Sequence, residues 1–456
     1  MRPAAGVLAF AIALLMVSAA VPASDPKATV VAPKAASSKK KTPTKKAATK
    51  SKPKQPSPAV TAKQRAQATD AVNSWVEAVK PIENPAALVP FLLRLSQFEN
   101  GQSTGLLRVL HFGDSHTAAD EWTGMIRHLL QSRFGDGGTG FLLPGRPFLG
   151  FRRLDTKSTA TSGWTTEGLA QATGDGLFGL GGTCISTRRA GESLSLAASG
   201  SRFELFYLKQ PEGGRLSVSV DGVSQPLIET DGERGPGYFK VEVEEGLHTL
   251  ALRTLDAAPV RLFGWVAENR SGVTYESLGI NGAQASLILN WNEELYDEHL
   301  KQRDPALIVL AYGTNEAGAK DWTEESYGAM FSDLIARLRK ASPTASILVI
   351  GPPDRYIRSQ GRMTVMDRVD MIVAAQRKAA LSGGCAFWDI REGMGGKGSM
   401  RQWVAAGLAQ PDYVHFTQDG YRLLGGALYE ELIRDLQFFQ QSYAGAQTPA
   451  AAGANR

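Results

Sequence analysis

Strands and helices alternate along the C-terminal part of this chain, and that order limits the folds it can adopt. Apolar, strand-like runs occur at 306–311, 346–350 and 385–390. Stretches with helical spacing lie at 325–340, 363–381 and 417–439. A chain with this order forms a parallel sheet with helices on both faces. We therefore predict an α/β domain for this part of the protein.

The same domain is predicted to begin earlier in the chain. Residues 106–112 read as a buried strand, which ends at Gly113-Asp114-Ser115. Helical spacing resumes at 123–134, so Ser115 lies at a turn from strand to helix. Backbone N–H groups at the start of a helix stabilise a negative oxygen. Ser115 is therefore a candidate nucleophile.

The stretch between these two parts has a different pattern. Short alternating runs are separated by turn signals such as Asp221-Gly222 and Glu245-Gly246. The runs are at 203–208, 216–220, 238–243, 248–252 and 260–266. Closely spaced short strands are typical of an antiparallel β-sandwich. We predict that such a sandwich interrupts the α/β domain.

The N-terminal residues resemble an export signal. Arg2 precedes an apolar run from 4 to 17, and small residues suited to cleavage follow at 21–23. The apolar stretch is also long enough to remain as a membrane anchor. Lys residues soon after a signal oppose translocation, which weighs against export. We expect an exported protein in the periplasm or cell envelope.

A basic segment follows the signal. Residues 26–65 are rich in Lys, Ala, Ser, Thr and Pro and contain no aromatic residue, so they are predicted to be a disordered tether. The tether is either a solvated spacer or a weak contact to anionic envelope polymers or membrane. Residues 1–65 hold 13 Lys+Arg and one acid, which leaves 50 − 13 = 37 bases and 45 − 1 = 44 acids in 66–456. The folded part is thus mildly acidic, which gives no support for nucleic-acid binding.

Six segments make up the predicted organisation. They are a signal peptide or anchor (1–25), the tether (26–65), the first part of the α/β domain (66–147), the inserted sandwich (148–270), the second part of the α/β domain (271–442) and a disordered tail (443–456). The two cysteines, Cys184 and Cys385, fall in different predicted domains. They form no disulfide framework or zinc motif, and we predict two buried free thiols.

A serine hydroxyl is a weak nucleophile unless a base lies beside it. His415 is the histidine that lies next to an acid, Asp412, in a loop that opens a helix. We predict that His415 takes the proton of Ser115 and that Asp412 orients the imidazole. The oxyanion then needs hydrogen-bond donors, and we predict the backbone N–H groups of Ser115 and Gly282 and the side-chain amide of Asn315. No metal or organic cofactor is required by this chemistry.

Each of these residues also has a purely structural interpretation. Taken alone, Ser115 is a helix cap, and the other positions fit turns. The remaining histidines are predicted to have no catalytic role: His111, His128, His248 and His299. Asp114 and His116 adjoin the nucleophile, and we expect them to support the site rather than to react.

The strings that carry these residues resemble the blocks of the SGNH, or GDSL, hydrolase superfamily. They are Gly113-Asp114-Ser115-His116, Gly279-Ile280-Asn281-Gly282, Gly313-Thr314-Asn315-Glu316 and Asp412-Tyr413-Val414-His415. The likeness covers about 100–147 and 272–440. It implies a three-layer α/β/α, flavodoxin-like fold. The family's serine, glycine, asparagine, aspartate and histidine fall on Ser115, Gly282, Asn315, Asp412 and His415.

The first block departs from the commonest pattern, because His116 stands where leucine is usual. With the insert and the string from Leu278 to Ala283, this resembles exported peptidoglycan O-acetylesterases, whose insert is similar to a carbohydrate-binding module. The resemblance implies removal of O-acetyl groups from peptidoglycan or another acetylated polysaccharide. An acetyltransferase, a lipase or thioesterase, and a non-catalytic glycan-binding protein remain alternatives. Four aromatic residues of the insert could stack on sugar rings: Trp164, Tyr207, Tyr238 and Trp265. Burial of these side chains inside the sandwich would exclude that role.

Overall fold

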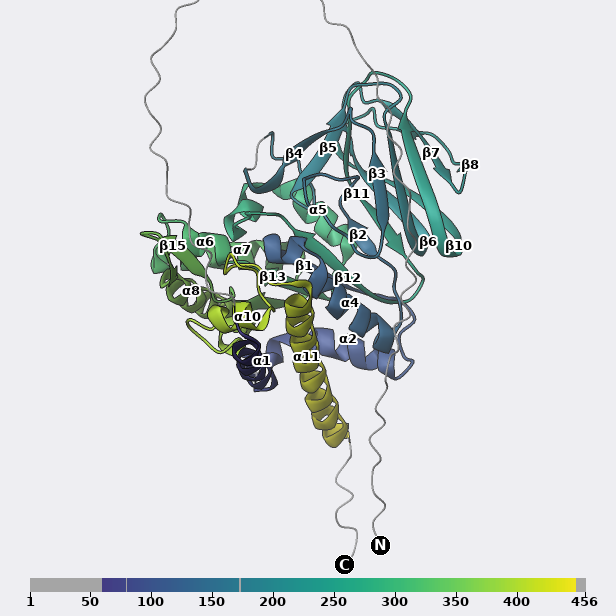
Figure 1. Cartoon of the computed structure of the whole chain (residues 1–456). Helices are drawn as coiled ribbons and strands as arrows, with labels where there is room; N and C mark the ends of the chain where they lie inside the picture. Colours follow the sequence, from purple (N-terminus) through teal and green to yellow (C-terminus); the bar gives the residue numbers. More distant parts are fainter. Residues whose placement is uncertain (1–59, 79, 172–173, 448–456) are drawn as a thin grey trace, which may run out of the picture. The chain divides into compact units, whose positions relative to one another are not determined.

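The computed structural model describes residues 60–78, 80–171 and 174–447, which belong to one compact unit (Figure 1). The predicted signal and nearly all of the predicted tether lie outside these residues. Of the helices that are described, none is long and apolar enough to cross a membrane.

A five-stranded parallel sheet forms the centre of the α/β domain. In chain order its strands are β1 (Leu106–Gly113), β12 (Gly272–Gly279), β13 (Leu307–Ala311), β14 (Ser346–Ile350) and β17 (Ala386–Trp388). Their order across the sheet is β12-β1-β13-β14-β17, and every neighbouring pair is parallel. This is the flavodoxin-like order 2-1-3-4-5, in which ligands bind where the direction of winding reverses. The predicted fold is confirmed, and its switch point lies at β1.

Helices cover both faces of this sheet. Residues alternate along β1, so that Val109 faces one apolar core and Leu110 faces the other. The core at Val109 is closed by α1 (Ala62–Glu77), α2 (Val89–Glu99), α4 (Glu121–Phe134) and α11 (Gln418–Gln447). The core at Leu110 is closed by α5 (Glu293–Arg303), α7 (Glu324–Ala341) and α8 (Arg368–Ser382). These are the three layers that the resemblance implied.

The segment between β1 and β12 contributes a ten-stranded antiparallel sheet, with β6 (Ser193–Lys209) and β10 (Gly235–Thr254) as its long strands. Its other strands are β2 (Gly140–Leu142), β3 (Lys157–Ala160), β4 (Thr165–Gly168), β5 (Thr183–Thr187), β7 (Arg215–Val220), β8 (Val223–Ser224), β9 (Ile228–Glu229) and β11 (Val260–Glu268). One apolar core contains side chains from both halves of β6, among them Leu196 and Leu205. The predicted antiparallel insertion is confirmed, although its strands are joined in one hydrogen-bonded sheet.

One predicted turn in this sheet is wrong. Glu245-Gly246 was expected to separate two strands, but both runs belong to β10. The register of β10 against β6 shifts between Glu242 and Gly246, so the extra residues form a bulge within a continuous strand. Glycine marks bulges as well as turns, which explains the error.

The insertion and the α/β domain share buried contacts. Phe206 and Phe263 of the antiparallel sheet lie in the same apolar core as Phe112 of β1. The strands of this sheet begin at Gly140 and end at Glu268, compared with predicted borders of 148 and 270. Both cysteines are free and buried, as predicted.

Three other borders differ from the predictions. Helix α1 begins at Ala62, because Thr61 and Gln64 form a capping box, so the tether ends before residue 65. A hairpin of β15 (Tyr356–Ser359) and β16 (Arg362–Val365) takes the start of the stretch predicted as a helix at 363–381. Helix α11 continues to Gln447, into the predicted tail, of which 448–456 lie outside the described residues.

The short helices are η1 (Pro85–Leu88), α3 (Ser115–Ala118), η2 (Leu169–Gln171), η3 (Ala285–Asn290), α6 (Thr314–Gly318), α9 (Ile390–Gly393) and α10 (Met400–Ala406).

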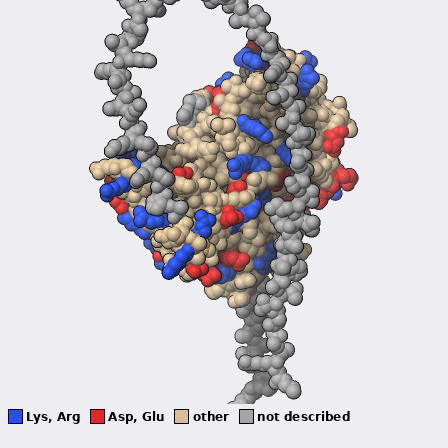
Figure 2. Space-filling view, viewed as in Figure 1, with Lys and Arg blue, Asp and Glu red and all other residues tan. Residues whose placement is uncertain are grey.

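The face of the protein seen in Figure 2 carries charges of both signs. Lys and Arg lie among Asp and Glu, and neither sign covers that face. This mixture fits the mildly acidic composition of residues 66–456.

Candidate active site

The edge where β1, β12 and β13 end brings three of the sequence strings together. Gly113 at the end of β1 is paired with Gly279 of β12 and with Ala311 of β13. Ser115 begins α3 directly after β1, and Gly313 precedes α6 directly after β13. The strings are therefore neighbours because their strands are neighbours, at the switch point of the sheet.

Ser115, His415 and Asp412 form a continuous hydrogen-bonded chain. The Oγ of Ser115 lies 2.9 Å from Nε2 of His415. On the other side of the ring, Nδ1 of His415 lies 2.8 Å from Oδ2 of Asp412. The structure thus brings together all three residues predicted as the triad. This is the arrangement in which an imidazole can take the serine proton while a carboxylate holds the ring.

A tight turn holds the carboxylate of Asp412. Its Oδ1 accepts the backbone N–H of Val414 at 2.9 Å and that of His415 at 3.0 Å. Partial burial raises the pKa of Asp412, but the hydrogen bonds from His415 and from these N–H groups outweigh it, so the pKa lies below its ordinary value. The carboxylate therefore stays charged at neutral pH. The side chains of His415 and Asp412 are 41% and 49% exposed, so the site opens to solvent.

The predicted oxyanion donors lie on two loops that are fastened to each other. Asn315 donates one amide hydrogen to the carbonyl oxygen of Ala283 at 2.8 Å, which orients the amide and leaves its second hydrogen for a ligand. Glu316 accepts the N–H of Ala285 at 2.8 Å and that of Gly313 at 3.0 Å. Burial raises the pKa of Glu316 to about 7. This carboxyl therefore links the Gly282 loop to the Asn315 loop.

Two glycines of the second string have specific steric roles. Gly282 is exposed and has a φ of 79°, a conformation that side chains disfavour. A Cβ on Gly279 would lie 2.1 Å from the backbone N of Ala118, in the helix that Ser115 begins. Glycine at 279 therefore allows the end of β12 to pack directly against the helix that Ser115 begins.

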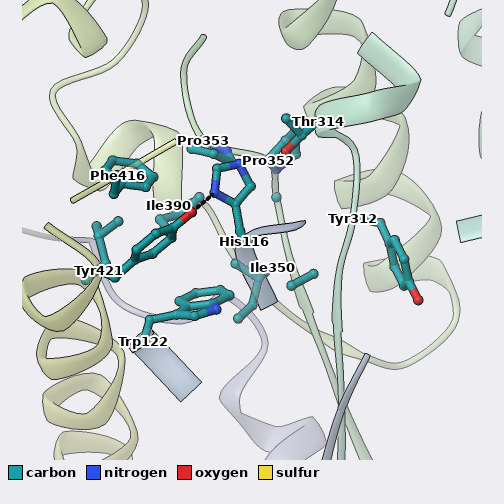
Figure 3. A pocket seen from close by; sticks show the side chains of 13 residues that line it. His116, Trp122, Tyr312, Thr314, Ile350, Pro352, Pro353, Ile390, Phe416 and Tyr421 are labelled. Atoms are coloured by element: carbon teal, nitrogen blue, oxygen red, sulfur yellow. Dashed lines mark hydrogen bonds between the residues drawn. The ribbon is translucent and has the colours of Figure 1, made fainter. Parts of the chain in front are cut away.

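Asp114 and His116 lie beside Ser115 and have hydrogen-bond partners of their own. Asp114 caps α3 by accepting the N–H of His116 at 2.9 Å, and burial raises the pKa of Asp114 to about 6. Nδ1 of His116 lies 2.9 Å from the hydroxyl of Tyr421, at an apolar pocket that Trp122 also lines (Figure 3). Burial lowers the pKa of His116 to about 3, so the ring is neutral. The centroid of the His116 ring lies 5.4 Å from that of the His415 ring, so the two rings pack side by side.

The other histidines occupy structural positions. His111 is buried, with Nδ1 2.8 Å from the Tyr275 hydroxyl, and burial lowers its pKa to about 3. His299 is buried among aromatic rings, His248 pairs with Asp221, and His128 is exposed on α4. None of the four contacts the triad among the described residues.

The four aromatic residues predicted as candidates for sugar stacking are buried or partly buried. Tyr207 and Trp265 are buried in the core of the antiparallel sheet, which excludes them from a sugar surface. Tyr238 is partly buried against Phe206, and Trp164 is partly buried with its indole N–H donated to Ser193. Glycan binding by the insertion stays a prediction.

The sequence reasoning missed one charged residue at the site, Arg355. It follows Pro352-Pro353-Asp354 in the loop after β14, at the same edge of the sheet as Ser115. The signal that could have found it is its position after the strand at 346–350. Across the described part of the chain, no group of three or more His, Cys, Asp or Glu side chains is placed to hold a metal ion.

Comparison with known proteins identifies the family. The GDSL-like lipase/acylhydrolase family matches residues 248–423, which include Gly282, Asn315, Asp412 and His415. These residues belong to the GDSL (SGNH) hydrolase family. A solved structure titled "Peptidoglycan O-acetylesterase in action, 5 min" is similar to this GDSL hydrolase over 76% of its chain and 96% of the other, with 28% identity and a TM-score of 0.67.

Two further solved structures are much more distant from this GDSL hydrolase. A family two carbohydrate esterase from Cellvibrio japonicus has 11% identity and a TM-score of 0.27, over 62% of this chain and 98% of the other. A salicylyl-acyltransferase from a tetracycline biosynthetic pathway has 13% identity and a TM-score of 0.28, also over 62% and 98%. These scores are too low to support an argument about function. No protein with a curated description matches the sequence.

Proposed function

We propose that this GDSL hydrolase is an exported serine esterase that removes O-acetyl groups from peptidoglycan. The observation that carries the proposal is the hydrogen-bonded chain from Ser115 through His415 to Asp412. It supports acyl transfer through a serine nucleophile. The substrate rests on the likeness to the peptidoglycan O-acetylesterase structure. Export rests on the sequence of residues 1–25.

The proposed reaction has two halves. Ser115 Oγ attacks the acetyl carbonyl carbon while Nε2 of His415 takes the hydroxyl proton. The resulting oxyanion accepts hydrogen bonds from the N–H groups of Ser115 and Gly282 and from the amide of Asn315. The bond to the sugar oxygen then breaks, and His415 gives the proton to that oxygen. An acetyl ester remains on Ser115.

Water completes the cycle by the same steps. His415 takes a proton from a water molecule, whose oxygen attacks the acetyl-enzyme. The tetrahedral intermediate collapses to acetic acid, which ionises to acetate in water, and His415 returns its proton to Ser115 Oγ. Asp412 stays ionised throughout and stabilises the imidazolium. The exposure of the His415–Asp412 pair leaves this side of the site open, which suits a polymeric substrate.

Acetate release from three substrates tests the substrate class. The full-length protein is incubated with O-acetylated peptidoglycan, acetylated xylan and a long-chain ester, and free acid is measured. We expect release from peptidoglycan to exceed the other two by about tenfold or more. Faster cleavage of the long-chain ester would indicate a lipase and contradict the proposal. Transfer of acetyl to an added chitooligosaccharide, in place of free acetate, would indicate an acetyltransferase.

A further inference from the structure

The loop that carries Gly282 is held at both of its ends. At its start, Ile280 donates its N–H to the carbonyl oxygen of Gly113, the last residue of β1, at 3.0 Å. At its far end, Ala285 donates its N–H to Oε1 of Glu316 at 2.8 Å. Gly282 itself is exposed, and glycine has no side chain that could fix its backbone. The position of the Gly282 N–H therefore depends on these two attachments.

Glu316 holds a second loop with its other oxygen. Its Oε2 accepts the N–H of Gly313 at 3.0 Å, at the start of α6. That bond alone would be an ordinary way to satisfy a free N–H at a helix start. The bond to Ala285 is different, because it reaches across to the Gly282 loop. One carboxylate thus sets the spacing between the two loops that carry predicted oxyanion donors.

The carboxyl of Glu316 lies in a costly place. Its side chain is 0% exposed, and no described Lys, Arg or His forms an ion pair with it. Burial raises the pKa of Glu316 to about 7, and the charge of Asp114 also raises this pKa, whereas the N–H groups of Ala285 and Gly313 lower it. A buried carboxyl without a cation costs free energy, and such groups are common at functional sites. The cost suggests that these two hydrogen bonds serve more than folding.

Two other hydrogen bonds join the same loops from their side chains. Asn315 donates to the carbonyl oxygen of Ala283 at 2.8 Å, and Trp322 donates to the side chain of Gln284 at 3.0 Å. The bond from Asn315 orients its amide only while Ala283 stays in place. Glu316 therefore acts on two predicted donors at once, on Gly282 through the backbone and on Asn315 through Ala283.

We propose that Glu316 is a positioning residue for the oxyanion, and that both of its oxygens are needed to keep the Gly282 and Asn315 donors directed at one point. The inference rests on the proposed esterase function. An oxyanion donor is effective at about 2.7 to 3.1 Å from the charged oxygen. Loops that move apart would weaken binding of the transition state and leave binding of the neutral ester almost unchanged.

Glu316→Gln tests this inference in the full-length protein. Glutamine is almost the same size but has one acceptor oxygen, so one of the two N–H groups then faces an amide N–H. At pH 8 we expect kcat for para-nitrophenyl acetate to fall by about tenfold or more, with KM within about twofold. Affinity for phenylboronic acid should fall by a similar factor, because its tetrahedral adduct on Ser115 places an oxygen where the oxyanion would lie.

Glu431→Gln is the matched control, because it makes the same change at another buried carboxyl. Glu431 lies on α11 and pairs with Arg434, away from both loops. Its kcat and boronate affinity should stay within about twofold of the wild type. Circular dichroism at the assay temperature shows that each variant is folded.

Ala285→Pro tests the same bond from its other side, and serves if Glu316→Gln does not fold. Proline removes the N–H of Ala285 and leaves the bond from Gly313 to Glu316. Position 285 is the first residue of η3, and Gln284 before it has φ −110° and ψ 153°, both of which suit proline. We expect the same loss of kcat and of boronate affinity.

Three results would overturn the inference. They are an unchanged kcat in folded Glu316→Gln, a fall in kcat with unchanged boronate affinity, and a loss that appears in KM alone. A wild type that binds the boronate but hydrolyses no acetyl ester would remove the esterase function by itself. The boronate affinities of wild type and variants would then still decide the role of Glu316.

Discussion

Replacing Ser115 with alanine is expected to lower kcat/KM for a small acetyl ester by about three orders of magnitude or more. In the proposed mechanism its hydroxyl attacks the ester, and His415 Nε2, which lies 2.9 Å from Ser115 Oγ, receives the proton. Without the hydroxyl, neither half of the proposed reaction can proceed, and the oxyanion donors and substrate binding retain only a residual part of the rate enhancement. The measurement is steady-state hydrolysis of para-nitrophenyl acetate.

The Ser115→Ala protein should nevertheless fold. Ser115 is half-buried, and alanine is a good residue at the start of a helix whose cap, Asp114, remains. The thermal unfolding midpoint should stay close to that of the wild type. Ser359→Ala, at an exposed position of β15, is the control for serine loss. A folded Ser115→Ala protein with near-wild-type turnover would remove Ser115 from the mechanism.

Glu268→Gln is expected to cost about 3 kcal/mol of the free energy of unfolding, because it removes the buried carboxylate that Arg303, Arg108 and Arg202 share and leaves Arg303 paired with Glu276 alone. Glu268 lies at the end of β11 and is 1% exposed. It accepts hydrogen bonds from Arg303 at 2.5 Å, from Arg108 of β1 at 2.7 Å and from Arg202 of β6 at 2.7 Å. The carboxylate thus ties the inserted sheet to the α/β domain. Denaturant unfolding measures the loss.

The same carboxylate makes stability depend on acid pH. Burial raises the pKa of Glu268, but the charges of Arg303 and Arg108 outweigh burial and hold the pKa far below its ordinary value. Its contribution is therefore present above the unfolded pKa of about 4.3 and is lost as pH falls further. Glu268→Gln should flatten the stability profile below that pH. Glu293→Gln, which removes an exposed ion pair with Lys340, is the matched control. It should leave the free energy of unfolding and its dependence on acid pH close to those of the wild type. An unchanged acid profile in Glu268→Gln would contradict this account of the cluster.

The strands and the positions of the site residues could be predicted because local signals carry them. The apolar run from Leu106 ends at a Gly-Asp-Ser turn, and each later string follows a strand or opens a helix. Parallel strands share a carboxyl edge, so the strings had to meet there once the sheet formed. The distances among Ser115, His415 and Asp412 agree with that expectation. The catalytic roles themselves stay predictions until turnover is measured.

Other features depend on contacts that are distant in the sequence. The bulge in β10 is defined by its pairing with β6, and a Glu-Gly pair alone does not distinguish it from a turn. The buried cluster at Glu268 joins residues from four elements, each of which has an ordinary charge in the sequence. Arg355 was missed for the same reason. Its place at the site is evident only once Thr314, to whose carbonyl oxygen it donates a hydrogen bond, lies beside it.

Mass spectrometry of the protein quenched during turnover tests the central claim most directly. The full-length enzyme is mixed with excess para-nitrophenyl acetate, stopped with acid within the first turnovers and digested for peptide mapping. We expect the mass of one acetyl group on the peptide that contains Ser115, in amounts that rise to a steady level and decay when the substrate is exhausted. The Ser115→Ala protein should show no such label. An acetyl group on another residue of the turning-over enzyme, with Ser115 unmodified, would contradict a mechanism through an acetyl-enzyme on Ser115.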